Sequence, residues 1–254
     1  MGVNCIVVVR EVWDTRDLID APLEGGAIKA GLDTRFEPED LNALETELRL
    51  KDEHGGTVTA VTVGEARSVD VLRECLYRGV DEVRRIEGDP MELDAHAYAA
   101  KVAGAVRELG ETDLILVGTT VVDGVNSLVG AHLASILDVD TVSWVDAIEE
   151  VGDGKAVAKR AIELGYEYVE VPLPAVLSIG VALLEDDPRA PRSAKAMLKL
   201  KMKKVPIETL SPAGGDAATR VAGYEEVPQR VIESKEVDPE DESALQSMLD
   251  ELLK

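Results

Sequence analysis

The sequence is poor in aromatic residues, histidine and cysteine. Phe, Trp and Tyr make up 3% of the 254 residues, and the chain has three histidines and two cysteines. His54, His96 and His132 lack metal-ligand spacing with one another or with a cysteine, so no metal site is predicted. Without a disulfide framework, Cys5 and Cys75 are predicted to be free, buried thiols.

Basic residues are outnumbered by acidic ones, and long apolar runs are missing. Lys and Arg number 27 against 50 Asp and Glu, which gives a formal charge of -23. This charge disfavours nucleic-acid and anionic-membrane binding. No apolar stretch is as long as a membrane span, so no membrane insertion is expected. Arg10 and Glu11 interrupt the first apolar run, which predicts no signal peptide and a cytoplasmic location.

Common catalytic motifs are missing too. The sequence contains no GxGxxG after its first apolar run, no GxxxxGK[ST] and no GxSxG. We therefore predict no catalytic residue and no metal ligand, which disfavours a stand-alone hydrolase or transferase.

Apolar residues account for 45% of the chain, and they follow a regular pattern. Strand-like runs alternate with amphipathic helical segments, which predicts an α/β, doubly wound, mostly parallel sheet. The predicted strands are 5–9, 57–64, 81–87, 114–118, 141–145 and 173–180. Between the last two, residues 151–171 contain a Gly-Asp-Gly turn and predict an antiparallel hairpin.

The pattern changes near residue 187. Residues 1–187 are predicted to be an α/β nucleotide-binding domain, and 188–254 a basic loop and long C-terminal arm. Residues 188–204 carry seven basic side chains, which either dock on an acidic surface or form a solvated helix. The arm ends in an amphipathic helix that packs on its own domain or on another subunit. Its apolar stripe is Leu245, Met248, Leu249 and Leu252.

A candidate phosphate site lies in the stretch LILVGTTVVDGVNSLVG. Gly118 ends a strand, Asp123 and Gly124 predict a turn, and Asn126 or Ser127 can cap a helix over 127–137. Ligands of open α/β sheets bind at the carboxyl ends of the strands, and a helix N-terminus suits a phosphate. An ordinary strand-to-helix connection also needs small and capping residues, so this alternative stays open.

Six stretches, in order, resemble the β subunit of electron transfer flavoproteins. They are CIVVVREV, LNALETELRLKDEHGGTVTAVTVG, VLRECLYRGVDEVRRI, AKRAIELGYEYVEVPLPAVLSI, DPRAPRSAKAMLKLKMKKVPIE and VPQRV. The resemblance covers nearly the whole chain. It implies an α/β fold whose arm wraps around an α subunit.

The resemblance also implies a cofactor and partners. The cofactor is an adenine nucleotide, FAD in the electron-bifurcating members and AMP in the others. The implied partners are the α subunit and a dehydrogenase or oxidoreductase, with NADH as a candidate donor. The family's site carries over onto Val8, Glu37, Pro38, Glu39, Asp40, Val63, Gly118, Thr119, Thr120, Val121, Val122, Asp123, Gly124, Val125, Asn126, Ser127, Leu128 and Val129.

The chain departs from the family at several positions. Gly124, Val129 and Gly130 favour the bifurcating kind, whereas Leu128 stands where the family has glutamine. Glu37 replaces an asparagine, and a carboxylate near phosphates is unfavourable unless it faces ribose or solvent. Residues 190–194 lack the leucine that non-bifurcating members present to their dehydrogenases.

Two functions are therefore carried forward. The first is an electron-transferring β subunit, with bifurcation from NADH slightly favoured over carriage from an acyl-CoA dehydrogenase. The alternative is a non-redox adenine-nucleotide-binding structural or sensor subunit, because one fold supports several functions.

Overall fold

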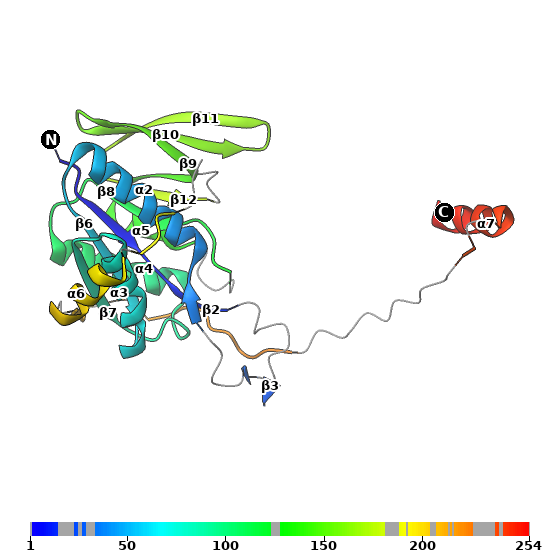
Figure 1. Cartoon of the computed structure of the whole chain (residues 1–254), viewed down its shortest axis with the longest axis horizontal. Coiled ribbons are helices and arrows are strands. Elements are labelled where there is room, and N and C mark those ends of the chain that lie inside the picture. Colours follow the sequence, from blue (N-terminus) through cyan, green and yellow to red (C-terminus); the bar gives the residue numbers. More distant parts are fainter. Residues whose placement is uncertain are drawn as a thin grey trace.

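A nine-stranded sheet organises the chain (Figure 1). The computed structural model describes residues 2–14, 23–24, 27–28, 34–122, 128–180, 188–191, 193–203, 207–212, 214, 216–225, 237–238 and 241–253. The strand order is β11-β10-β9-β12-β8-β1-β6-β7-β13. The six strands from β12 to β13 pair in parallel, as do β9 and β12, whereas β9, β10 and β11 pair antiparallel. The predicted fold class is confirmed.

The strands of this sheet are β1 (Cys5–Val8), β6 (Val58–Gly64), β7 (Glu82–Glu87), β8 (Leu114–Gly118), β9 (Asp140–Gly152), β10 (Lys155–Ile162), β11 (Gly165–Pro172), β12 (Ala175–Ile179) and β13 (Glu208–Leu210). The helices are α2 (Pro38–His54), η1 (Ala66–Ser68), α3 (Val69–Arg78), α4 (Ala95–Leu109), α5 (Val129–Leu137), α6 (Ala194–Lys203) and α7 (Glu242–Leu252). Two short ribbons pair β2 (Glu11–Trp13) with β5 (Thr34–Phe36), and β3 (Leu23–Glu24) with β4 (Ala27–Ile28).

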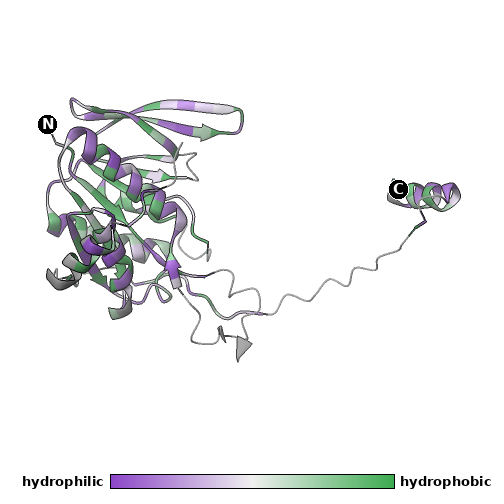
Figure 2. Ribbon diagram, viewed as in Figure 1, coloured by the Kyte–Doolittle hydropathy of each residue, from purple (hydrophilic) through white to green (hydrophobic). Residues whose placement is uncertain are grey.

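The central strands are buried on both faces. Successive residues of a strand point to opposite faces, so Val7 packs with the cluster of α2 and α3, and Val8 with the cluster of α4 and α5. Figure 2 shows the resulting hydrophobic colour along the central strands. Cys5 and Cys75 are free and buried, as predicted. In the described part of the chain, no helix is long and apolar enough to cross a membrane.

Two strands differ from the sequence-based expectation. The strand expected at 141–145 continues to Gly152, so β9, β10 and β11 form a three-stranded antiparallel unit. After α6 the chain returns to the sheet as β13, which pairs in parallel with β7. No strand was expected there, because three residues carry too little periodicity.

Besides the pairing of β13 with β7, the arm makes side-chain contacts with the α/β layers. Near its start, the Arg189 guanidinium donates to Glu45 on α2 at 2.8 Å and to Asp52 at 2.9 Å. Further on, the Asp94 carboxylate accepts the backbone N–H groups of Ala218 and Thr219. Figure 1 shows α7 apart from the α/β layers.

Asp94 tests the second of these contacts. Its carboxylate also caps α4 by accepting the N–H of Ala97 at 2.9 Å. The N–H bonds from Ala97 and Thr219 lower its pKa to about 2. We predict that Asp94→Ala lowers the thermal midpoint and speeds amide exchange at Ala218 and Thr219.

The pH dependence has a defined direction. The unfolded-state pKa of Asp is about 3.9, so the stabilisation is complete above that pH and is lost as the pH falls toward about 2. Wild type and Asp94→Ala should therefore converge over this window. Asp70→Ala, which removes an exposed first-turn carboxylate of α3, is the control. A constant difference between wild type and Asp94→Ala down to pH 2 would contradict the assignment.

Candidate functional site

The chain order places a topological switch point between β1 and β8, and we call the carboxyl ends of these two strands the crevice. From β1 the chain runs through α2 to β6 and β7, then returns through α4 to β8 on the other side of β1. The connections leaving β1 and β8 therefore diverge at their carboxyl ends. Ligands of doubly wound sheets bind at such a switch point.

Arg10 follows β1 and forms a buried ion pair with Asp40 in the first turn of α2. Arg10 is 4% exposed and Asp40 is fully buried. The guanidinium donates through Nε to Asp40 Oδ2 at 2.9 Å and through Nη2 to Oδ1 at 2.7 Å. Burial alone would lower the pKa of Arg10, but the charge and hydrogen bonds of Asp40 outweigh it and raise that pKa. Arg10 therefore stays charged.

The same ion pair holds the loop that leaves β8. Arg10 Nη2 donates to the carbonyl oxygens of Gly118 at 2.9 Å and Thr120 at 3.1 Å. Asp40 Oδ1 accepts the N–H of Gly118 at 2.8 Å. One pair thus joins β1, α2 and the loop after β8.

Two more carboxylates from the start of α2 continue this pattern. Glu39 accepts the N–H and the hydroxyl of Thr120, and Glu37 accepts the N–H of Val122 at 3.0 Å. Asp40 accepts the N–H of Gly118 in the same way. Three carboxylates therefore accept hydrogen bonds from the N–H groups of every second residue between 118 and 122. We call this arrangement the carboxylate ladder. It leaves these three N–H groups unavailable to a ligand.

Glu37 therefore faces neither ribose nor solvent, the two orientations considered from the sequence. It is 1% exposed and occupies the N-cap of α2. Burial raises the pKa of its carboxyl, against the opposing effect of the Val122 N–H. Its hydrogen bonds are with the chain itself, as are those of Glu39 and Asp40.

Position 118 requires glycine because neighbouring atoms lie too close to its Cα for a side chain. A Cβ added there would lie 2.7 Å from Asp40 Oδ1, 2.8 Å from Glu39 Cβ and 2.9 Å from Arg10 Nη2. All three neighbours are buried, so none has free space to move into. The sequence marked Gly118 as a strand end, but the packing reason needs the third dimension.

On the other side of the crevice, α5 lies close to β8 and β12. A Cβ added at Gly130 would approach Ser178 Oγ to 2.3 Å and Val117 Cγ1 to 3.0 Å. The helix begins at Val129, two residues later than expected, and Leu128 takes the N-cap position without a side-chain capping bond. The first N–H groups of a helix have no partner within it, so they can receive an anion.

The remaining predicted site residues differ in their surroundings. Val8 and Val63 are core residues at adjacent strand ends, and Pro38 begins α2. Val121 is buried, whereas Val122 and Leu128 are exposed. Residues 123–127, which contain the predicted turn and capping side chains, lie outside the described residues.

Thr119 differs from its neighbours. Its N–H donates to the Ile179 carbonyl at 2.8 Å, which ties the loop to β12. Its hydroxyl is buried, yet it has no hydrogen-bond partner among the described residues. Because buried polar atoms are almost always paired, this hydroxyl at the carboxyl end of β8 is a candidate contact for a ligand atom.

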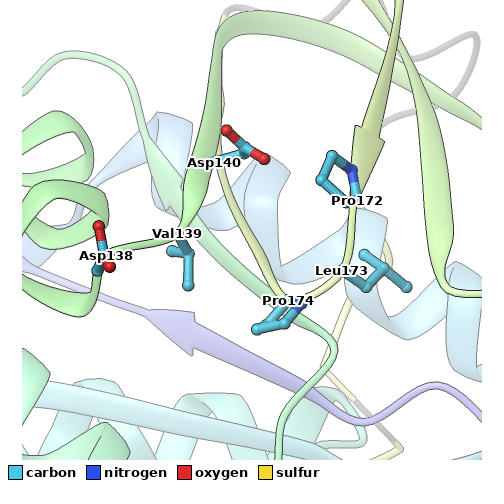
Figure 3. A pocket seen from close by; sticks show the side chains of 6 residues that line it. All are labelled: Asp138, Val139, Asp140, Pro172, Leu173 and Pro174. Atoms are coloured by element: carbon cyan, nitrogen blue, oxygen red, sulfur yellow. The ribbon is translucent and has the colours of Figure 1, made fainter.

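A separate depression of about 310 Å³ lies at the opposite edge of the sheet, near the starts of β9 and β12 (Figure 3). It is lined by Asp138, Val139, Asp140, Pro172, Leu173 and Pro174. Its two carboxylates and its lack of a cation do not suit a phosphate. In the described residues, no group of three His, Cys, Asp or Glu side chains could hold a metal.

Comparison with known proteins identifies the family. The electron transfer flavoprotein domain matches residues 26–214. The chain belongs to the electron transfer flavoprotein β-subunit family. It is 35% identical over 186 residues to subunit CarD of the caffeyl-CoA reductase–Etf complex of Acetobacterium woodii, covering 72% of this chain and 70% of CarD. The family inferred from sequence is thus confirmed.

Two further relatives are electron transfer flavoprotein β subunits. That of Thermoanaerobacterium thermosaccharolyticum is 34% identical, covering 69% of this chain and 67% of the relative. That of Bacillus subtilis is 32% identical, covering 82% of this chain and 78% of the relative.

The sequence analysis of this chain did not predict that Arg10 and the carboxylate ladder form one unit. The available indication was an arginine directly after a buried strand, since a buried cation needs a partner.

Gly118→Ala tests the close packing of the ladder. We predict that it lowers the free energy of unfolding by about 1–3 kcal/mol, the usual cost of overpacking. Urea unfolding measures this loss. Gly152→Ala is the matched control, because a Cβ there meets nothing within 4 Å. Equal stability of the two variants would show that Gly118 does not need its small size.

Proposed function

We propose that this chain is the β subunit of a heterodimeric electron transfer flavoprotein and binds an adenine nucleotide between β1 and β8. It passes electrons between a dehydrogenase or NADH and the flavin of the α subunit. FAD is the proposed nucleotide, with AMP as the alternative. The hydroxyl of Thr119, which has no hydrogen-bond partner among the described residues, is the observation that carries the location.

Several N–H groups beside the crevice already have hydrogen-bond partners, and this limits which residues would hold the nucleotide. The N–H groups of Gly118, Thr120 and Val122 are bonded to carboxylates. The Thr119 N–H is bonded to Ile179. Donors of the described residues that lack such a bond include the Thr119 hydroxyl and the first turn of α5, which begins at Val129. We therefore expect phosphate oxygens on the α5 side of the crevice.

Exposed apolar side chains favour FAD over AMP. Val122 is 42% exposed and Leu128 is 63% exposed, on either side of residues 123–127. FAD would cover more of this apolar surface than AMP would. Bound FAD would supply the capacity to accept and release electrons, and the chain's own residues would bind and orient it. The similarity of Gly124, Val129 and Gly130 to bifurcating members points the same way.

The names of relatives support an oxidoreductase partner. One is a subunit of a caffeyl-CoA reductase–Etf complex. Another, from Anaerotignum propionicum, is the electron transfer subunit gamma of acryloyl-CoA reductase and is 31% identical over 179 residues. Both names describe subunits that work with a reductase acting on a CoA thioester.

Thr119→Val tests the location of the nucleotide. The change keeps the side-chain shape and removes the hydroxyl, so the apoprotein should be as stable as wild type or slightly more stable. Nucleotide affinity should fall about 5- to 10-fold, the value of one lost hydrogen bond. Isothermal titration of FAD and of AMP into the apoprotein measures both affinities.

Thr141→Val, at the opposite edge of the sheet, is the control and should bind as wild type does. Unchanged affinity in Thr119→Val would place the nucleotide elsewhere. The nucleotide released by heat from the native complex then distinguishes the functions. FAD in addition to the α-subunit flavin supports the proposal, AMP supports its alternative form, and no additional adenine nucleotide contradicts both.

Deletion of the terminal helix α7 tests whether this helix helps to hold the α subunit. Its stripe includes Leu245, Met248 and the exposed Leu249, and α7 lies apart from the α/β layers (Figure 1). We predict that deleting 238–254 leaves the α/β layers folded by circular dichroism but reduces recovery of the α subunit in co-purification. Equal recovery with the truncated and full-length chains would rule out a role for α7 in holding the partner.

A further inference from the structure

Trp144 on β9 has an uncommon backbone conformation. Its φ is 59°, in the left-handed region that bulky residues rarely adopt. The residue is nevertheless 45% exposed, so burial of its side chain does not explain the conformation. Strained backbone of this kind is found preferentially at binding sites, where the surrounding structure holds it in place.

The strain comes with an extra residue in β9. From Leu177 to Ile179 the strand β12 advances by two residues, whereas its partner β9 advances by three, from Val142 to Val145. Both valines belong to the core cluster of α2 and α3, although regular alternation would place them on opposite faces. This bulge keeps the core on both sides and directs Trp144 out of it, as bulges beside binding sites do.

The pairing of the strands places Trp144 beside the crevice. Gly118, at the end of β8, is level with Ile179 on β12, and Ile179 is level with Val145. Because neighbouring strands lie about 4.8 Å apart, Val145 lies about 10 Å from Gly118 along the carboxyl edge. A nucleotide that begins at the crevice is long enough to reach this position.

The indole lies toward the face of the sheet that α5 covers. The Gly180 N–H donates to the Val145 carbonyl at 3.2 Å, so the pairing of β12 with β9 continues to Gly180. Gly180 therefore faces the same way as Ser178, whose Oγ lies against Gly130 at the start of α5. A Cβ added at Gly180 would lie 3.3 Å from Cε3 of Trp144, so the glycine leaves room for the indole.

A carboxylate lies close to the same place. The Cβ added at Gly180 would lie 3.9 Å from Asp146 Oδ1. A carboxylate repels phosphate, but it accepts hydrogen bonds from N–H groups on the edge of a planar ring, such as the amine of adenine or the N3–H of isoalloxazine. The face of an indole stacks on such a ring. Trp144 and Asp146 therefore suit the ring of a nucleotide and not its phosphates.

We propose that Trp144 stacks on the planar heteroaromatic ring of the bound nucleotide and that Asp146 accepts a hydrogen bond from the edge of that ring. This inference rests on the proposed function, which supplies the nucleotide. The phosphates stay at the first turn of α5. Ser178 and Gly180 are two residues apart, so the ring lies about 7 Å further along β12, a separation that a ribose or ribityl group spans.

The test uses the full-length apoprotein and isothermal titration of FAD and of AMP. Trp144→Leu should weaken binding about tenfold, because the stacking face is lost. Adenine occurs in both nucleotides and isoalloxazine only in FAD. Weaker binding of both therefore identifies adenine as the stacked ring, and weaker binding of FAD alone identifies isoalloxazine. Asp146→Ala should weaken the same nucleotides about fivefold, the value of one hydrogen bond.

Three further variants keep the test decisive. Trp144→Phe retains an aromatic face and should bind within about threefold of wild type. Trp144→Gly adopts the positive φ without strain, so its thermal midpoint should stay close to wild type while its affinity falls as in Trp144→Leu. Tyr168→Leu on β11 removes another exposed aromatic side chain, 64% exposed, and should bind as wild type does.

The outcomes separate the inference from the proposed function. If the wild-type apoprotein binds an adenine nucleotide and both Trp144→Leu and Trp144→Gly bind it equally well, the stacking inference is wrong and the proposed function stands. If the wild-type apoprotein binds neither FAD nor AMP, both fail. A loss of stability in Trp144→Gly without any loss of affinity would show that Trp144 has a structural role instead.

Discussion

The buried ion pair of Arg10 and Asp40 determines the geometry of the carboxyl edge of the sheet. Burying two charges costs several kcal/mol per ion, so such a pair contributes little net stability. Its contribution here is positional. The pair bonds to the backbone of Gly118 on both its N–H and its carbonyl oxygen. The end of β1, the start of α2 and the loop after β8 therefore cannot shift independently.

The carboxylate ladder follows from this constraint. Once Asp40 holds Gly118, the next alternate N–H groups of the loop lie opposite Glu39 and Glu37. Three acidic residues can thus stand beside a predicted phosphate site without pointing at it, because each is bonded to a backbone N–H. The ladder closes one side of the crevice to anions. The first turn of α5 and the Thr119 hydroxyl remain on the other side.

Much of this fold was predictable because its causes are local. The limits of α2 follow from Glu37 at the N-cap, Pro38 in the first turn and Gly55 at the C-cap. The alternation of strands and helices likewise predicts the parallel sheet and its carboxyl edge. β9 was harder, because register shifts against β10 and a positive φ at Trp144 interrupt the period of two. β13 depends on pairing with β7, a contact distant in sequence.

The site was predictable only in part, because its hydrogen bonds also join residues that are distant in sequence. Strand-ending residues can be assigned to one edge from topology alone, and so Glu37, Glu39 and Gly118 could be grouped. Which carboxylate faces which N–H depends on the separation and rotation of α2 relative to β8. No periodicity in the sequence encodes that relation, and the same limit applies to the hydroxyl of Thr119.

The most direct test of this account is a crystal structure of the chain with its adenine nucleotide bound. The account predicts phosphate oxygens at the first turn of α5 and a ligand atom on the Thr119 hydroxyl. The N–H groups of Gly118, Thr120 and Val122 should keep their bonds to Asp40, Glu39 and Glu37. Phosphate oxygens bonded to those three N–H groups, with the carboxylates displaced, would contradict it.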